Sequence, residues 1–164
     1  MHKTGRVWKY GDNVNTDVIF PGKYIYTHME PIEMGSHALE GMDARFAVES
    51  VPGDVIVAGV NWGCGSSREQ AVKCLTARGI KAVVAKSFSR IYFRNAINVG
   101  LLAIVCPKCS DEAADGDHVS IDIMKGAICS LGRIWTFAQF PEFLRDILDA
   151  GGLLPYIKRI ALNK

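Results

Sequence analysis

Three short apolar runs separated by two helix-like segments restrict what the middle of this chain can form. Residues 53–59, 80–85 and 101–106 are rich in valine, isoleucine and leucine, and each run has the length of a buried strand. Between them, residues 66–79 and 87–100 have the apolar spacing of helices, and each segment ends in glycine. This alternation predicts parallel strands joined by right-handed crossovers.

The flanking segments predict additions to this α/β unit. Residues 118–137 alternate in short runs interrupted by glycine, which is typical of antiparallel, barrel-like hairpins. Residues 141–160 predict a helix, a double-glycine break and a short helix that begins near Pro155. Before the unit we expect a short strand, an ordered turn-rich loop and a weakly helical segment interrupted by glycines, at 5–11, 12–25 and 30–50. Since no linker is apparent, we expect a single domain over 1–164.

The composition argues against several classes of protein. The 164 residues are 49% hydrophobic, which is enough apolar material for one domain with a substantial core. The net charge is only +2, and no basic stripe or aromatic–basic repeat is present, so nucleic-acid binding is not expected. No apolar run approaches the roughly 20 residues of a membrane span, and the first ten residues lack the apolar core of a signal peptide. We therefore expect a cytoplasmic protein with no membrane partner.

The five cysteines predict neither a disulfide framework nor a metal site. An odd number without a secretion signal argues against paired disulfides. Cys106 and Cys109 form a CPKC pair that resembles half of a metal knuckle, but His118 and Cys129 stand alone and do not supply the other half. The sequence therefore favours a strand end running into a turn at 106–109, with a metal knuckle or a redox pair as alternatives.

The stretch NWGCGSSREQ at 61–70 is the strongest candidate for a binding site. It lies between a predicted strand and a predicted helix, where ligands usually bind in α/β sheets. Gly63 and Gly65 allow a tight turn and a close approach to a ligand. The following helix start and the guanidinium of Arg68 both favour a carboxylate.

A purely structural interpretation explains part of the same stretch. Ser66 and Glu69 have the spacing of a capping box, in which a serine and a glutamate satisfy the first backbone donors of a helix. Cys64 is either a small side chain between two glycines or a thiol activated by the helix start. From spacing alone, an anion site and simple capping both stay open.

Three blocks of the sequence resemble the signatures of the aconitase swivel-domain family. They are GDNVNTDVIFPGKY at 11–24, GCGSSRE at 63–69 and AKSFSRIYFRNAINVGL at 85–101, in the order in which the family has them. The resemblance covers essentially the whole chain. It implies an α/β, aconitase swivel-domain-like β/β/α three-layer fold, with parallel βαβ units plus antiparallel barrel-like strands. A free-standing swivel domain of this length resembles the small subunits of isopropylmalate dehydratases and their homoaconitase-type relatives.

The resemblance also implies a partner and a reaction. The partner is a large iron–sulfur subunit, in a heterodimer or heterotetramer, whose [4Fe–4S] cluster is held by three cysteines and leaves one iron open to substrate. The reaction is a dehydration followed by a rehydration, which moves a hydroxyl to the neighbouring carbon. The cysteines of this chain lack cluster spacing, so we expect that it binds no metal or cofactor and is inactive alone.

Site residues follow from the matching positions. Ser66 matches the serine that acts, as an alkoxide, as the base on the proton alpha to a carboxylate. Ser67 and Arg68 match substrate-carboxylate contacts, and Thr16 and Asp17 belong to the matching active-site loop. A serine hydroxyl is a poor base unless its anion is stabilised, and loop N–H groups, a helix start and a guanidinium can stabilise it in a closed site.

The segment KYIYT at 23–27 bears on the substrate. In relatives that act on tricarboxylates, an arginine at the position of Tyr26 would meet the extra carboxylate. Tyr26 offers an apolar ring and one hydroxyl, so it favours an alkylmalate, unless it belongs to the core. The alternatives are a homoaconitase or 2,3-dimethylmalate dehydratase small subunit, or a non-enzymatic anion-binding regulatory domain.

Overall fold

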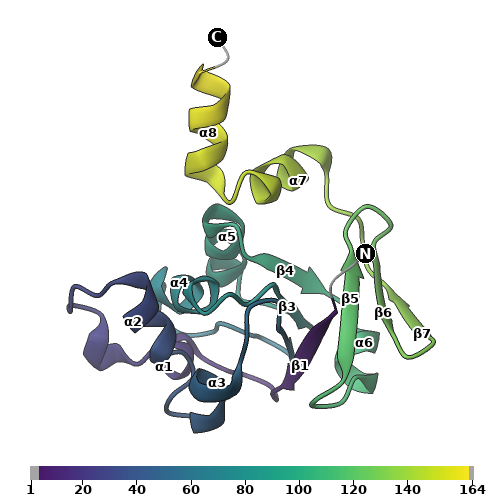
Figure 1. Ribbon diagram of the computed structural model, residues 1–164, viewed down its shortest axis with the longest axis horizontal. Coiled ribbons are helices and arrows are strands. Elements are labelled where there is room, and N and C mark those ends of the chain that lie inside the picture. Colours follow the sequence, from purple (N-terminus) through teal and green to yellow (C-terminus); the bar gives the residue numbers. More distant parts are fainter. Residues whose placement is uncertain (1–3, 163–164) are drawn as a thin grey trace.

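Seven strands form one curled, mixed sheet in the order β4-β3-β2-β1-β5-β6-β7 (Figure 1). The structure is a computed structural model that describes residues 4–162. Strand β1 joins two halves, because it pairs in parallel with β2 and antiparallel with β5. The parallel strands β1 to β4 are Gly5–Lys9, Val55–Ala58, Ala82–Ala85 and Leu102–Val105. The antiparallel strands β5 to β7 are His118–Asp122, Ala127–Ser130 and Arg133–Thr136.

The parallel half confirms the predicted alternation of strands and helices. Helix α4 (Gln70–Ala77) connects β2 to β3, and helix α5 (Arg90–Val99) connects β3 to β4. Every residue of β2 and β3 is buried, as expected for strands that are covered on both faces. Gly79 and Gly100 follow the two helices with φ angles of 85° and 87°, so left-handed glycines end both helices as predicted.

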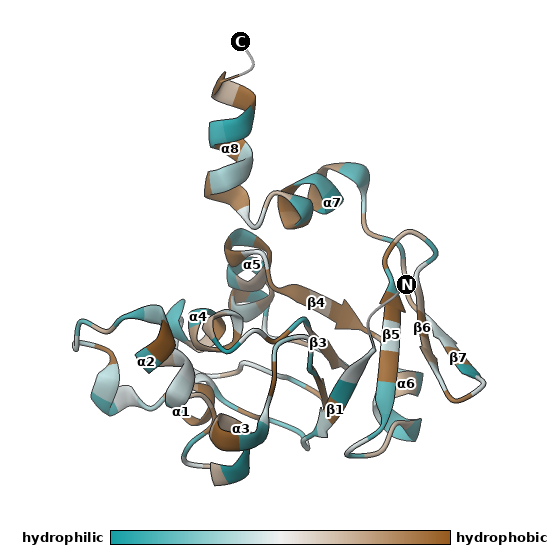
Figure 2. Ribbon diagram, in the orientation of Figure 1, coloured by the Kyte–Doolittle hydropathy of each residue, from teal (hydrophilic) through white to brown (hydrophobic). Residues whose placement is uncertain are grey.

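Alternate residues of the parallel strands face two different cores. Val83 of β3 belongs to the core that contains Leu75 of α4 and Tyr92 of α5. Its neighbour Val84 belongs to the opposite core, which contains Trp135 of β7. The parallel half of the sheet is therefore the middle layer between helices and the curled antiparallel strands. Figure 2 shows β4, one strand of this half, in the colour of hydrophobic residues.

Short helices fill the segments that flank the parallel unit. The antiparallel hairpins expected at 118–137 are confirmed as β5 to β7. The other helices are α1 (Thr16–Ile19), η1 (a 3-10 turn, Gly22–Tyr24), α2 (Pro31–Ser36), α3 (Ala44–Glu49), α6 (Pro107–Glu112), α7 (Glu142–Asp149) and α8 (Leu153–Leu162).

The predicted break at Gly35 and the predicted turn at residues 106–109 were both wrong, because each lies at a helix. Gly35 does not interrupt the first helix of the 30–50 segment but lies inside α2, where a Cβ would lie 3.1 Å from the backbone nitrogen of Arg78. The glycine therefore permits close packing of α2 near the end of α4.

Residues 106–109 are not a turn, because Pro107 takes the first position of helix α6, where its missing N–H carries no penalty.

The carboxyl-terminal helix extends away from the sheet (Figure 1). Helix α8 begins at Leu153, two residues before Pro155, and has no buried residue. Leu154 and Ile157 are 71% and 50% exposed. Across residues 4–162, no helix has both the length and the apolar character that crossing a bilayer demands.

A buried carboxylate fixes the start of the sheet. Asp54, which precedes β2, is 2% exposed and accepts a hydrogen bond from Trp8 Nε1 at 2.9 Å. It also accepts from the backbone N–H groups of Val51 at 3.0 Å and Arg6 at 3.3 Å. One side chain thus satisfies three donors around β1, the strand that holds the two halves of the sheet together.

We expect Asp54→Ala to lower the free energy of unfolding by about 3 kcal/mol, because it leaves buried donors without an acceptor. Urea denaturation followed by tryptophan fluorescence measures this loss. The exposed Asp149→Ala, at the end of α7, is the matched control and should change stability by less than about 0.5 kcal/mol. Equal effects of the two substitutions would remove Asp54 from this role.

Candidate active site

Three loops meet at the carboxyl ends of the parallel strands. They follow β1, β2 and β3, and the backbone joins them directly. The N–H of Thr16 donates to the carbonyl of Cys64 at 2.8 Å, and the N–H of Gly63 donates to Val14 at 2.8 Å. The N–H of Trp62 donates to the carbonyl of Ser87 at 3.0 Å. All three signature blocks of the sequence therefore converge on one place.

Glycine is required where the second loop crosses helix α5. Gly63 and Gly65 have φ angles of 74° and 92°, a region that other residues rarely adopt. A Cβ on Gly63 would lie 2.2 Å from Cγ of the buried Tyr92. The tight turn expected from the sequence is therefore present, and it lies directly against an aromatic ring of the third block.

Ser89 fastens the same loop and was missed by the sequence analysis. Its Oγ donates to the carbonyl of Gly63 at 2.6 Å and accepts from the N–H of Tyr92 at 3.3 Å. Its own N–H donates to the carbonyl of Trp62 at 2.9 Å. A serine before a helical run signals an N-cap. That signal identifies the cap of α5, whereas the bond to Gly63 depends on tertiary structure.

The predicted capping box is wrong. Helix α4 begins at Gln70, and Glu69 at its N-cap position makes no side-chain capping bond. Ser66 precedes the helix and lies exposed in the loop. The hydroxyl of Thr16 donates to the carbonyl of Ser66 at 2.9 Å and holds its backbone outside the helix. In the described part of the chain, the hydroxyls of Ser66 and Ser67 have no hydrogen-bond partner.

Arg68 and Asp17 pair across two loops. Nη1 of Arg68 donates to Oδ1 of Asp17, and the arginine side chain is 18% exposed. A Cβ on Gly22 would lie 3.0 Å from that carboxylate oxygen and 3.3 Å from the guanidinium, so the glycine backbone covers the pair. Asn15 orients the segment, because its side chain accepts from the N–H of Val18 at 2.9 Å and caps α1. The structure thus brings Thr16 and Asp17 to the loop that carries Ser66, Ser67 and Arg68.

The comparisons with known proteins agree with this convergence. A family model described as the aconitase C-terminal domain matches residues 12–109. The chain belongs to the aconitase C-terminal domain family. This membership and the three-layer architecture confirm the swivel-domain fold predicted from the sequence.

Relatives within the family are similar over nearly the full chain. The "3-isopropylmalate dehydratase small subunit" of Ruminiclostridium cellulolyticum is 46% identical, over 96% of this chain and 98% of the relative. The protein of the same name from Aquifex aeolicus is 47% identical, over 100% and 99%. The crystal structure of 3-isopropylmalate dehydratase LeuD from Methanocaldococcus jannaschii has a TM-score of 0.91 and 48% identity, covering 97% of this chain and 95% of that one.

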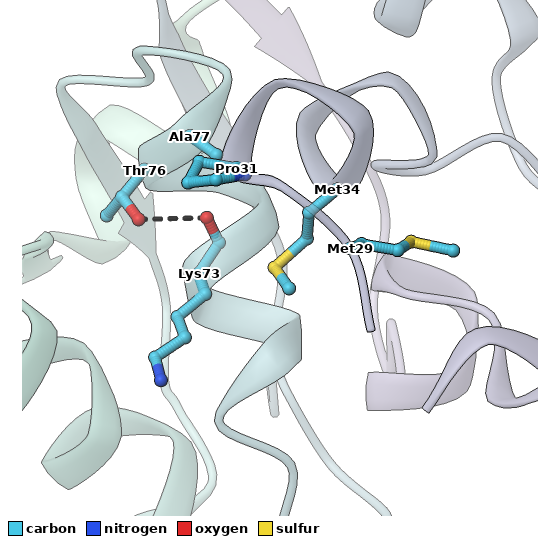
Figure 3. A pocket seen from close by; sticks show the side chains of 6 residues that line it. All are labelled: Met29, Pro31, Met34, Lys73, Thr76 and Ala77. Carbon is cyan, nitrogen blue, oxygen red and sulfur yellow. Dashed lines mark hydrogen bonds between the residues drawn. The ribbon is translucent and has the colours of Figure 1, made fainter. Parts of the chain in front are cut away.

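Tyr26 makes no contact with the other predicted site residues. It follows η1 and is 99% exposed, so the alternative that it belongs to the core is wrong. No hydrogen bond or ring contact within residues 4–162 joins it to Ser66, Arg68 or Asp17. A separate hollow of about 490 Å³ lies between α2 and α4 (Figure 3). It is lined by Met29, Pro31, Met34, Lys73, Thr76 and Ala77, and it contains none of the predicted site residues.

The cysteines divide into buried and accessible thiols. Cys74, Cys106 and Cys109 are buried, whereas Cys64 and Cys129 are partly accessible. Burial raises the pKa of the Cys109 thiol to about 12 and raises the pKa of Cys74 as well. Within residues 4–162, no group of three or more histidine, cysteine, aspartate or glutamate side chains lies close enough to hold a metal ion.

We expect thiol labelling of the native protein at pH 8 to be confined to Cys64 and Cys129. The thiolate is the reactive form, and burial keeps the reagent away from Cys74, Cys106 and Cys109. The raised pKa values of Cys74 and Cys109 also keep those two thiols protonated at that pH. Iodoacetamide labelling with peptide mass spectrometry measures each site, and protein unfolded in urea, in which all cysteines react, is the control. Rapid labelling of Cys109 in the native protein would contradict the assignment of CPKC to the core.

Proposed function

We propose that this chain is the small subunit of a two-subunit hydro-lyase, a 3-isopropylmalate dehydratase of leucine biosynthesis. The pair interconverts 2-isopropylmalate and 3-isopropylmalate by dehydration and rehydration. The names of the two 46–47% identical relatives support this proposal, because the similarity covers nearly the whole chain. The observation that carries the chemistry is the exposed Ser66, whose hydroxyl has no partner among residues 4–162 and whose loop also carries Arg68.

In this proposal, Ser66 is the general base. Its alkoxide takes the proton alpha to a substrate carboxylate during dehydration, and the hydroxyl returns a proton during rehydration. Because α4 begins only at Gln70, the anion would depend mainly on loop N–H groups and on Arg68, with a smaller contribution from the helix. The hydroxyl of Thr16 donates to the backbone carbonyl of Ser66. This bond holds the backbone and leaves the Ser66 hydroxyl free to accept and return a proton.

Arg68 and Ser67 bind the carboxylate that all candidate substrates share. Asp17 occupies Nη1 of Arg68, whereas Nε and Nη2 have no partner among the described residues. Those two donors form one edge of the guanidinium and suit a bidentate carboxylate. Asp17 therefore fixes the guanidinium from one side and leaves the other side for substrate.

The iron–sulfur cluster belongs to the large subunit in this proposal. The described residues do not offer a set of cluster ligands, and the buried Cys74 and Cys109 have raised thiol pKa values. When bound, such a cluster supplies the Lewis acid that assists loss of the substrate hydroxyl. The complex is a heterodimer or a heterotetramer, and we place it in the cytoplasm.

The substrate is an alkylmalate, and Tyr26 faces its variable substituent. A relative named "Isopropylmalate/citramalate isomerase small subunit" from Methanocaldococcus jannaschii is 45% identical, over 94% of this chain and 93% of the relative. A methyl-bearing malate is therefore the second candidate substrate. A fully exposed tyrosine on a turn is free to line a cavity that a partner completes.

Reconstitution tests the proposal. Mixed anaerobically with its large subunit, the chain should isomerise isopropylmalate, and neither subunit should do so alone. Ser66→Ala should lower kcat by about 10²–10⁴-fold, because it removes the base. Since Ser66 caps no helix, the same variant should unfold at the same urea concentration as the wild type. The exposed Ser36→Ala in α2 is the control for activity, and near-normal turnover of Ser66→Ala would exclude this serine as the base.

Two further variants should separate shared binding from selectivity. Arg68→Lys keeps the positive charge but loses the two parallel donors that bind a carboxylate in bidentate fashion. The value of kcat/KM should therefore fall about 10²-fold for every substrate. Tyr26→Arg places an unpaired charge beside an alkyl group and should shift the ratio of kcat/KM for isopropylmalate over homocitrate-type substrates by about tenfold or more. Measuring both substrates on both variants distinguishes the patterns. An unchanged ratio in Tyr26→Arg would place Tyr26 outside the site.

A further inference from the structure

An apolar hollow with two arginines lies beside the active-site loop. It has a volume of about 360 Å³, and Ser87, Phe88, Arg90, Phe93, Arg94 and Val105 line it. A second hollow of about 230 Å³ shares Phe93 and Val105 with the first and continues past Ala103 and Phe137. Because the two hollows share two lining residues, they form one groove beside β4, the edge strand of the parallel half.

The charges of this groove are not neutralised by any residue between 4 and 162. Arg90 and Arg94 are one helical turn apart on α5, and both are exposed. Neither makes a hydrogen bond or an ion pair with any residue described by the structure. Val105 at the end of β4 is 48% exposed, although the other three residues of that strand are buried. Arginine and aromatic side chains around a desolvated pocket are the residues that dominate binding energy at protein interfaces.

The groove is physically connected to the site. Ser87 lines the first hollow, its Oγ accepts from the N–H of Asn61 at 2.8 Å, and its carbonyl accepts from the N–H of Trp62 at 3.0 Å. These two bonds hold the start of the loop that carries Ser66. The groove and the loop also lie at the same carboxyl-terminal end of the parallel strands, so a partner that covers Ser66 approaches this end.

We propose that this groove docks a segment of the large subunit that carries a carboxylate beside an apolar side chain. The inference rests on the proposed two-subunit function and adds the place and the chemistry of contact. The carboxylate pairs with Arg94 and Arg90, and the apolar side chain fills the hollow between Phe93 and Val105. A second copy of this chain fits less well. A twofold contact through this patch would bring the arginines of both copies together, and like charges repel.

Calorimetric titration of the large subunit with variants of this chain tests the docking. Arg94→Glu should raise the Kd about tenfold or more, because it sets a carboxylate against a carboxylate. Val105→Asp should have a similar effect through the apolar part of the groove. Lys125→Glu is the matched control, since Lys125 is exposed in the turn between β5 and β6 and should leave the Kd unchanged. At saturating concentrations of the variant chains, turnover per complex should stay within about twofold of the wild type.

The outcomes separate the docking from the proposed function. An unchanged Kd for both Arg94→Glu and Val105→Asp overturns the docking, and it leaves the function intact if the complexes turn over isopropylmalate. A wild-type pair that binds without turnover defeats the proposed function, while the comparison of Kd values still decides the docking. If Arg94→Glu changes only self-association, measured by light scattering, the occupant is a second copy and the inference fails.

Discussion

The contact between the Tyr92 ring and the backbone of Gly63 is the constraint on which the site depends. A methyl group on residue 63 would overlap the ring, and the φ angle of 74° disfavours any other residue in that place. The contact sets how closely the loop approaches α5. The hydroxyl of Ser89 then donates to the carbonyl of Gly63 and holds the loop at that distance. Because Gly63 also bonds to Val14, the segment with Thr16 is positioned by the same turn. One close approach therefore aligns three loops that are distant in sequence.

The electrostatics of Ser66 follow from where α4 begins. The field of a helix start weakens within about one turn, and Ser66 precedes Gln70, where α4 begins, by about that distance along the chain. In the proposed mechanism, stabilisation of the serine anion therefore depends mainly on the guanidinium of Arg68 and on loop N–H groups. Asp17 reduces the positive potential of that guanidinium, since it pairs with Arg68, but it also fixes the group in place. The ion pair thus weakens the positive potential of Arg68 but gives its guanidinium a defined orientation.

The sequence predicted the elements that local patterns determine. Buried strands and helices ended by glycine were confirmed, because apolar periodicity and left-handed glycines act locally. The start of α4 was wrong, because a bond from Thr16, distant in sequence, holds Ser66 outside the helix. Ser89 and Gly22 were missed for the same reason, since their effects pass through contacts between loops. The resemblance to a family supplied the remaining site residues, and their roles stay predictions.

The exposure of Ser66 and Ser67 explains why the proposed enzyme needs two chains. An alkoxide in water gains nothing from nearby dipoles that water does not already supply, whereas the same dipoles act strongly once water is excluded. This chain fixes the donors and the arginine but leaves the serine open to solvent. The wall that excludes water must therefore arrive with the partner. Assembly would then change the dielectric around the proposed base, so in this mechanism closure of the two subunits would itself be the step that activates Ser66.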